Sequence, residues 1–436
     1  MNYSEAIRFL YGLRLFGAKF GLDNTLRLAV LADNPQEHLR FIHVAGTNGK
    51  GSTCAMLESI YRSAGLRVGL FTSPHLVSFR ERIQVNRQLI SEREVVRLVT
   101  EIQPLLKQFA ANHHPTFFEV VTIMALKFFA EQKCDLVIWE TGLGGRLDAT
   151  NIVTPLASVI TNIAFDHQQW LGDTLGRIAA EKAGIIKPGV PVITATDEPE
   201  ALRVIKETAT AKSAPLAIVA ADGRPPPIEK TAALCRGAAT SPLAGAHQKI
   251  NAMLALTTVE ILHSKIPVGE EPIRAGLARV NWPGRLQLVE HQGQRILLDG
   301  AHNVAGAEAL RAALETEFAG ARPVLIFGAL NDKKWQAICR ILAPLAAKVF
   351  TVPVASERAA SANDLASAFP SANPKLAAVA MRNLEEAIIA CKHEPFVVVT
   401  GSLYLVGEAL ELLGLSPAGT GERGLNEWSA PSESGN

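Results

Sequence analysis

The feature that most constrains the fold is an apolar run that leads directly into a glycine-rich turn, FIHVAGTNGKGST at residues 41–53. The apolar residues 41–44 predict a buried strand, and the pattern of residues 52–64 predicts a helix. Glycines let backbone N–H groups gather around a phosphate, and the N-terminus of the helix adds partial positive charge at the same place. The unit therefore predicts an α/β domain that binds the phosphates of a nucleotide.

Two side chains of this turn suit a triphosphate. Lys50 is placed to neutralise the β- and γ-phosphates, and the Ser52 hydroxyl to bind Mg²⁺. The spacing differs from the usual phosphate loop, because the turn is shorter and Gly51 separates the lysine from the serine. The predicted nucleotide-binding residues of the turn are Gly46, Thr47, Asn48, Gly49, Lys50, Gly51 and Ser52.

Short apolar runs alternate with helical patterns along most of the chain. The predicted strands of the first part are 41–44, 68–71, 136–140, 157–161 and 191–194, and the clearest helices are 52–64, 92–111, 118–132 and 249–263. Continuously apolar strands that alternate with helices favour an open parallel sheet covered on both faces. We therefore expect an α/β fold whose N-terminal domain is a phosphate-loop-type parallel sheet.

The turn Pro283-Gly284 interrupts this pattern, and a second series follows with apolar runs at 296–298, 324–327, 349–352 and 396–400. We expect a large domain at 1–282 and a smaller, Rossmann-like α/β domain at 283–415. Residues 222–246 predict a surface loop or short strands. Residues 416–436 are rich in Gly, Ser, Pro and Glu, which predicts a disordered tail.

Composition narrows the class of partner. The 43 basic and 42 acidic residues balance, which gives no electrostatic footprint for nucleic acid or an anionic membrane. The five cysteines are scattered and form no CxxC pair, so we expect a reducing compartment and no zinc site. No apolar run reaches the roughly 18 residues of a membrane span. We expect a monomeric, cytoplasmic protein that binds small molecules.

Polar residues follow three further predicted strands. Ser73 comes after strand 68–71, Glu140 ends strand 136–140, and His167 follows strand 157–161. In an open parallel sheet, ligands bind outside the carboxyl ends of the strands. These hydroxyl, carboxylate and imidazole groups are therefore predicted to meet the phosphate loop and to bind divalent metal there.

Two other positions are ambiguous from the residues alone. Asp299 and His302 lie in a turn after an apolar strand of the second domain, where they could contact a nucleotide across a cleft. Lys182 reads as a helix-surface lysine.

Several strings together resemble the folylpolyglutamate and dihydrofolate synthases of the Mur ligase superfamily. They lie at 46–52, 73–76, 81–82, 140–151, 166–167, 181–185, 283–285, 299–303 and 401–404. They occur in the order seen in that family and extend from about residue 20 to 406. The resemblance implies a Mur-ligase-type central domain that binds ATP and folate, followed by a Mur-ligase-type C-terminal domain.

The resemblance also implies roles for individual residues. It implies that Lys50, Lys182 and His302 are catalytic, and that Lys182 is carbamylated. The implied metal ligands, for two Mg²⁺ ions, are Ser52, Ser73, Glu140 and His167. The implied ATP contacts beyond the phosphate loop are Asn251, Arg285, Asp299 and His302. The implied contacts to the pterin-bearing substrate are Arg82, Phe118, Asp148 and Ala149.

The activity implied is ATP-dependent addition of L-glutamate to a folate, and also to dihydropteroate, through an acyl phosphate. The string at 146–149 is more similar to members with both activities, and folylpolyglutamate synthesis alone is the alternative. From the residues alone, a phosphate-loop GTPase or kinase and a nucleotide-binding module without ligase activity stay open.

Overall fold

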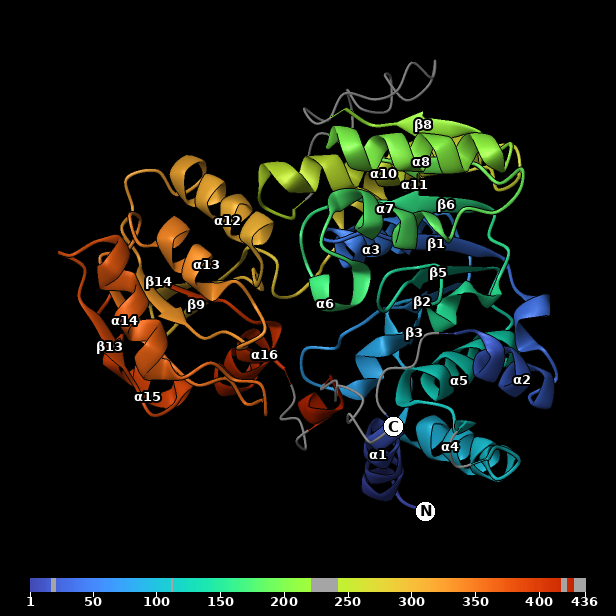
Figure 1. Ribbon diagram of the computed structural model, residues 1–436, viewed down its shortest axis with the longest axis horizontal. Coiled ribbons are helices and arrows are strands. Elements are labelled where there is room, and N and C mark those ends of the chain that lie inside the picture. The colour runs from blue at the N-terminus through green and yellow to red at the C-terminus, as the bar shows by residue number, and fades with distance from the viewer. Residues whose placement is uncertain (17–20, 111–112, 221–241, 417–421, 427–436) are drawn as a thin grey trace.

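The computed structural model describes the chain except for residues 17–20, 111–112, 221–241, 417–421 and 427–436. Two α/β domains lie side by side, one around an eight-stranded sheet and one around a six-stranded sheet (Figure 1). Most of the segment predicted as a surface loop or short strands, 222–246, falls outside the described residues. Among the described residues, no helix is long and apolar enough to cross a membrane.

The N-terminal sheet has the strand order β4-β3-β2-β5-β1-β6-β7-β8. Its six parallel strands are β1 (Phe41–Ala45), β2 (Val68–Phe71), β5 (Leu136–Glu140), β6 (Ala157–Ile160), β7 (Val192–Thr194) and β8 (Leu216–Ile218). Every residue of β1, β2 and β5 is buried, as expected for central parallel strands. The parallel order brings the ends of these strands to one edge, where the site lies.

One edge of this sheet differs from the predicted all-parallel arrangement. Strands β3 (Ile83–Val85) and β4 (Gln88–Leu89) form an antiparallel hairpin beside β2. Only Asn86 and Arg87 connect them, and both have positive φ, 51° and 66°. A two-residue connection of this backbone form reverses the chain with the twist that a hairpin requires.

Helices cover both faces of the sheet. Side chains of α1 (Tyr3–Gly12), α2 (Asp23–Leu31), α4 (Glu92–Leu106) and α5 (Phe117–Glu131) form one core with Phe71 and Trp139. Helices α7 (Leu175–Ala183) and α8 (Pro199–Ala211) form another with β6 and β7. The core on the opposite face contains α3 (Lys50–Ser63), α10 (Ala246–Ile261) and α11 (Glu270–Ala278). The short α6 (Gln168–Leu171) lies near the site.

The C-terminal sheet has the order β13-β12-β11-β14-β10-β9. The strands are β9 (Gln287–His291), β10 (Gln294–Leu298), β11 (Val324–Phe327), β12 (Lys348–Thr351), β13 (Ala378–Ala380) and β14 (Phe396–Thr400). All neighbours are parallel except β9, which pairs antiparallel with β10. This is the predicted smaller α/β domain with an added edge strand.

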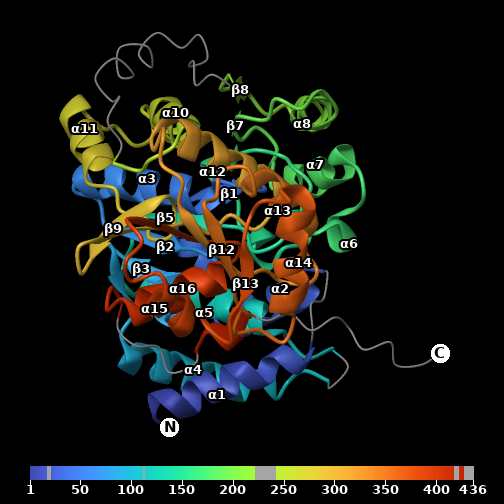
Figure 2. The ribbon, with the colours of Figure 1, turned by 90° about the vertical axis from the view of Figure 1, so that its left-hand side faces the viewer.

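Five helices cover this second sheet. They are α12 (Val304–Thr316), α13 (Trp335–Leu342), α14 (Ala362–Ala372), α15 (Leu384–Ala390) and α16 (Leu403–Leu412). The first three share one core and the last two another, because alternate residues of the strands face opposite sides. Figure 2 views the molecule from the side of this domain and shows α13 and α14 opposite α15 and α16.

The end of the chain departs from the predicted disordered tail. Residues Glu422–Asn426 form a 3-10 turn, η6, that lies against the N-terminal domain. Leu425 is 1% exposed and belongs to the core that contains α1, α4 and α5. The buried Leu425 and the hydrogen bonds that Glu422 accepts from Tyr3, Ser78 and Phe79 give this segment a defined position. The rest of the predicted tail beyond Ser416 lies outside the described residues.

Candidate functional site

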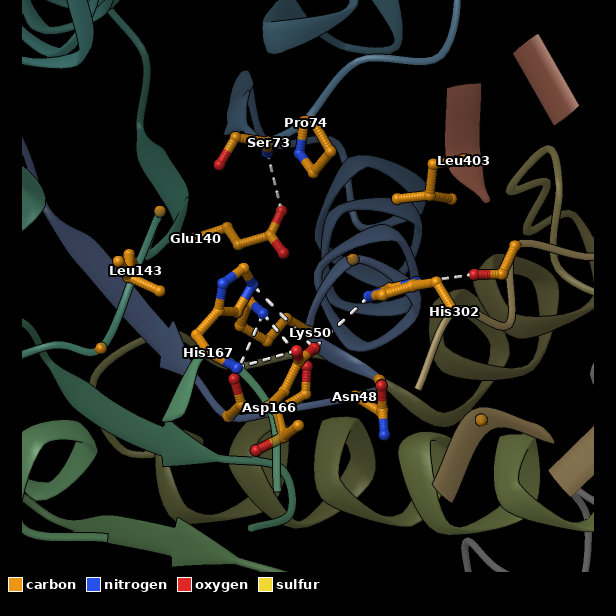
Figure 3. Close-up of a pocket in the computed structure, with 18 of the residues that line it drawn as sticks. Asn48, Lys50, Ser73, Pro74, Glu140, Leu143, Asp166, His167, His302 and Leu403 are labelled. Carbon is orange, nitrogen blue, oxygen red and sulfur yellow. Dashed lines mark hydrogen bonds and ion pairs between the residues drawn. The ribbon is translucent and has the colours of Figure 1, made fainter. Parts of the chain in front are cut away.

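A cavity of about 920 Å³ lies where the two domains meet. It is lined by every residue singled out from the sequence: Gly46, Thr47, Asn48, Gly49, Lys50, Gly51, Ser52, Ser73, Arg82, Phe118, Glu140, Asp148, Ala149, His167, Lys182, Asn251, Arg285, Asp299 and His302. The structure thus brings together residues separated by more than 250 positions. Figure 3 shows the part of this cavity around Lys50.

The phosphate loop joins β1 to α3 in a conformation that depends on two glycines. Gly46 has φ of 146°, and a Cβ there would lie 1.8 Å from the Thr161 hydroxyl oxygen. Gly49 has φ of 84°, and a Cβ there would lie 2.4 Å from the Asn251 Oδ1. Only glycine combines these backbone angles with such close neighbours. The loop therefore leaves its backbone accessible to a bound anion.

Lys50 begins α3 and folds back over this loop. Its Nζ donates hydrogen bonds to the carbonyl oxygens of Gly46 and Thr47, at 3.2 and 3.3 Å. Among the described residues, no carboxylate forms an ion pair with Lys50, and the hydrogen-bond partners of its Nζ are neutral carbonyl groups. This arrangement leaves the ammonium group available to a phosphate oxygen.

Helix α10 supports the loop from the other side. Gln248 donates from Nε2 to the Ser52 hydroxyl at 3.3 Å, and Asn251 donates from Nδ2 to Gln248 Oε1 at 2.9 Å. Ser52 is 2% exposed and Asn251 5%. The amides therefore hold the Ser52 hydroxyl and the Gly49 turn in place.

The residues predicted to bind metal lie around the same loop. Glu140 accepts a hydrogen bond from the Ser73 backbone N–H at 3.0 Å (Figure 3). Burial raises the pKa of Glu140 to about 7, against the opposing effect of the Lys50 charge. Burial lowers the pKa of His167 to about 3, which leaves its imidazole neutral and able to act as a ligand.

This donor set suits magnesium that also binds phosphate. Among the described residues, no three His, Cys, Asp or Glu side chains lie close enough to hold a metal by themselves. Mg²⁺ is commonly bound through one or two carboxylates and completes its shell with water and substrate phosphates. One carboxylate, one neutral imidazole and two serine hydroxyls fit that requirement.

Lys182 is not the surface residue that its helix position suggested. It is 4% exposed, and its Nζ donates to the Gly46 carbonyl oxygen at 2.8 Å. Burial, reinforced by the charge of Lys50, lowers the pKa of Lys182 to about 7. A fraction of this amine is therefore unprotonated near neutral pH, which is the form that reacts as a nucleophile.

The second domain reaches the loop through amide and ionic contacts. Asn303 and Asn48 exchange two side-chain hydrogen bonds, at 3.0 and 3.3 Å. Asp166 accepts from Lys333 at 2.6 Å and from Asn303 at 3.1 Å, and it lies 3.5 Å from His302 Nε2. Burial would raise the pKa of Asp166, but its hydrogen bond with His302 and the charge of Lys333 hold it well below the usual range. The domains are thus joined directly beside Lys50.

Three of these residues were missing from the predicted site. Asp166 and Asn303 lie next to His167 and His302, in two of the segments that resemble the family. Those segments could have identified them. Lys333 gave no sequence signal, because a lysine in the polar stretch before α13 is typical of any surface loop.

The turn after β10 presents the other predicted residues of this domain. Asp299 accepts from the backbone N–H groups of Leu286 and Ala301, at 2.9 and 3.0 Å, so its carboxylate fixes the turn. His302 hydrogen-bonds the Gly300 carbonyl through Nδ1 at 2.8 Å, which leaves Nε2 directed toward Asp166. Arg285 donates to the Gly284 carbonyl at 3.0 Å. The turn faces the phosphate loop rather than solvent.

The opposite end of the cavity is more apolar. Phe118 packs against Phe71, with ring centroids 5.9 Å apart, and a Cβ on Gly142 would lie 2.5 Å from the Phe118 ring. Asp148 accepts from the backbone N–H groups of Leu143 and Thr150, at 2.7 and 3.0 Å. Burial raises the pKa of Asp148 despite these hydrogen bonds. Arg82, Phe118 and Asp148, together with Ala149, form a surface suited to a flat ring with polar edges.

Two family models match this chain. Residues 44–259 match the Mur ligase middle domain, and residues 284–403 match the glutamate ligase domain of Mur ligases. The two matches cover the two sheets and leave out the segment between them.

Relatives match over nearly the whole chain. A dihydrofolate synthase/folylpolyglutamate synthase of Bacillus subtilis is 38% identical, over 93% of this chain and 98% of its own. A crystal structure of folylpolyglutamate synthase from Thermotoga maritima superposes with a TM-score of 0.82 at 35% identity, covering 97% of this chain and 99% of that one. E. coli FolC in complex with DHPP and ADP gives 0.80 at 28% identity, covering 95% and 98%. The chain therefore belongs to the folylpolyglutamate and dihydrofolate synthase family of Mur-type, ATP-dependent ligases.

Proposed function

We propose that this enzyme adds L-glutamate to a folate, and also to dihydropteroate, at the expense of ATP. The observation that carries the proposal is the single cavity that joins a phosphate loop to an apolar end with a buried arginine. One molecule with a ring and a carboxylate can extend between these ends. Its carboxylate would then meet the γ-phosphate of ATP beside Lys50.

In the first step, a carboxylate oxygen of the acceptor attacks the γ-phosphorus of ATP. The bond between that phosphorus and the β–γ bridging oxygen breaks, and ADP leaves with the electron pair. Negative charge develops on the bridging oxygen and on the phosphoryl oxygens. Lys50, whose ammonium is held by neutral carbonyls, stabilises that charge without having to break an ion pair.

In the second step, the amine of glutamate attacks the acyl carbon and inorganic phosphate departs, while the amine loses a proton. The acyl phosphate would react with water if the cavity stayed open. The contacts of Asn303 and Lys333 with the first domain close the cavity next to the phosphate loop. His302 lies at this junction, with its Nε2 3.5 Å from Asp166.

Ser52, Ser73, Glu140 and His167 would hold magnesium. The metal would supply charge neutralisation to the phosphates when bound. The protein contributes by keeping the Glu140 carboxylate fixed through the Ser73 N–H and by keeping His167 neutral.

We further propose that Lys182 is carbamylated. Its burial and lowered pKa supply the unprotonated amine that reacts with CO₂. The product is an anion in place of a cation, beside the phosphate loop and close to the residues proposed to hold magnesium. This change would remove the repulsion between Lys182 and Lys50.

The two acceptors are separated by one experiment. Reactions with ATP, Mg²⁺ and glutamate are run with dihydropteroate or with tetrahydrofolate, and products are identified by mass spectrometry. Addition of one glutamate residue to both acceptors supports the two activities. Product from tetrahydrofolate alone leaves folylpolyglutamate synthesis only, and product from neither contradicts the proposed function.

The same reactions test the two alternative functions, a kinase or GTPase and a nucleotide-binding module without ligase activity. A kinase or GTPase would release nucleoside diphosphate without dependence on glutamate, and a binding module would release none. We also expect the enzyme to be a monomer in the cytoplasm. Size-exclusion chromatography with light scattering should give the mass of one chain.

A further inference from the structure

The end of the chain returns from the second domain to the first. After α16 the described chain resumes at Glu422, and η6 contacts α1 and the 3-10 helix η3 (Phe79–Arg82). In Figure 1 it is the short red turn between α16 and α1. Leu425 and Asn426 both line the cavity, at the end that holds Arg82 and Phe118. The sequence patterns predicted no function for this segment.

Glu422 anchors the turn. Its Oε2 accepts hydrogen bonds from the Ser78 hydroxyl, the Phe79 backbone N–H and the Tyr3 hydroxyl, at 3.0, 2.6 and 3.1 Å. Glu422 is 4% exposed. A buried carboxylate with three donors gives the segment a defined position on the first domain.

The anchored segment forms a closed ring of hydrogen bonds with Arg82 and His75. Arg82 donates from Nη2 to Asn426 Oδ1 at 2.5 Å and from Nε to His75 Nδ1 at 2.8 Å. Because Nδ1 accepts here, the proton of His75 lies on Nε2, which hydrogen-bonds the Glu422 carbonyl oxygen at 3.0 Å. Asn426 completes the ring by donating from Nδ2 to the His75 carbonyl oxygen at 2.9 Å.

This ring orients the arginine without neutralising it. Arg82 is 3% exposed, and among the residues that the structure describes no carboxylate lies within ion-pair distance of it. Its guanidinium carbon lies 5.3 Å from the centroid of the Phe117 ring. Burial lowers the pKa of Arg82 to about 10, so the side chain still carries its charge at neutral pH. A buried cation held by neutral groups at the wall of a cavity favours an anionic ligand.

We propose that Asn426 is a positioning residue for the acceptor substrate: the C-terminal turn completes the acceptor site and holds Arg82 toward an anionic group of the substrate. The inference rests on the proposed function, because it takes the acceptor to be a carboxylate-bearing molecule. It adds a specific contribution from a segment that lies outside both matched domains.

The test compares three variants of the full chain. Asn426→Ala removes both side-chain hydrogen bonds of the ring. Asn426→Asp keeps the shape but places a carboxylate against Arg82, where it competes with the substrate. Asn363→Ala makes the same chemical change at an exposed position of α14 and serves as the control. For each variant, KM for the acceptor, KM for ATP and kcat are measured, together with the melting temperature.

We expect Asn426→Ala to raise KM for the acceptor about tenfold, the effect of losing a hydrogen bond to a charged group. Asn426→Asp should raise KM for the acceptor further, because its added carboxylate pairs with Arg82 and competes with the anionic group of the substrate. In both Asn426 variants, KM for ATP and kcat should change by less than about twofold. In the control Asn363→Ala, all three kinetic constants should stay within the same range, as expected for a neutral surface substitution.

Three outcomes would overturn the inference. One is an unchanged acceptor KM in Asn426→Ala, and another is an acceptor KM for Asn426→Asp below that for Asn426→Ala. The third is a parallel fall in melting temperature and kcat with no change in acceptor KM, which would indicate a structural role alone. If the unmodified enzyme shows no turnover dependent on acceptor and glutamate, the proposed function itself fails, and the two failures are thereby distinguished.

Discussion

The two ends of the cavity are built in different ways. At the phosphate end, one short loop between β1 and α3 lies at the centre, and its shape depends on Gly46 and Gly49. At the opposite end, which is the proposed acceptor end, Arg82, Phe118 and Asp148 come from separate segments, and Asn426 of the C-terminal turn hydrogen-bonds Arg82. The shape of the phosphate end is set mainly by the backbone of one loop. The shape of the opposite end is set by side chains that come from separate segments of the chain.

The difference also concerns charge. Lys50, Lys182, Glu140 and His167 lie close together, and burial shifts the pKa of the last three toward their neutral forms. At the proposed acceptor end, the buried Arg82 is held by neutral hydrogen-bond partners, His75 and Asn426. Substitutions at the phosphate end should therefore change turnover, and those at the acceptor end should change KM for the acceptor.

The largest effect is expected for Lys50→Ala. Loss of the ammonium should lower kcat on the order of 10²-fold or more, as for other preorganised groups that stabilise developing charge. KM for the acceptor should hardly change. Steady-state assays of ADP release measure both, with Lys206→Ala on the exposed side of α8 as the control. Turnover within a few-fold of the unmodified enzyme would contradict the assignment.

A second variant, Lys182→Ala, tests the proposed carbamate. We expect kcat to fall about tenfold or more, because a charge that supports the phosphate site is lost. Short carboxylates such as acetate or formate should restore part of the activity by entering the vacated space. Depletion of bicarbonate should lower the activity of the unmodified enzyme. No rescue, together with indifference to bicarbonate, would argue against a carbamate.

Phe118→Ala probes the apolar end. The aromatic surface contributes about 1 kcal/mol or more to binding a flat ring, so KM for the acceptor should rise about fivefold or more. The value of kcat and KM for ATP should stay close to the original values. Phe118→Leu keeps apolar volume without the ring and separates stacking from packing. A main effect on kcat would show that the two ends are not independent.

The last prediction concerns the stability of the ligand-free protein rather than its turnover. The pKa of Lys182 is about 7 when folded and near 10.4 when unfolded, so between these values the unfolded chain binds more protons. Stability should therefore rise from pH 7 to pH 9, on the order of 1 kcal/mol per pH unit at most. Lys182→Met should flatten this rise in urea unfolding in CO₂-free buffer. An equal slope in both proteins would mean that Lys182 titrates normally.

Sequence patterns located the phosphate end because its information is contiguous. The loop between Gly46 and Ser52 can be read directly, and Ser73, Glu140 and His167 follow from the rule that parallel strands end at one edge. The prediction that Lys182 lies on the surface of its helix was wrong, because the residues that cover it are distant in the sequence. A helix pattern gives the spacing of α7 but not the loop that lies over it.

At the proposed acceptor end, the important contacts join residues that are distant in the sequence, and local sequence patterns could not predict them. Asn426 lies in a stretch whose composition predicts disorder, and only the buried Leu425 and the three donors to Glu422 give it a place. Lys333 likewise becomes meaningful only when the second domain lies beside Asp166. Such contacts join residues more than 160 positions apart, so no local pattern records them.

By itself, the sequence determined the two α/β domains, the phosphate loop and the family, because each depends on residue order and periodicity within short segments. Tertiary structure alone decided that Lys182 is buried, that Asp166 joins the two domains and that the end of the chain reaches Arg82. The physical reason is that burial and charge pairing depend on which segments meet in space, whereas strand, helix and turn depend mainly on neighbours along the chain.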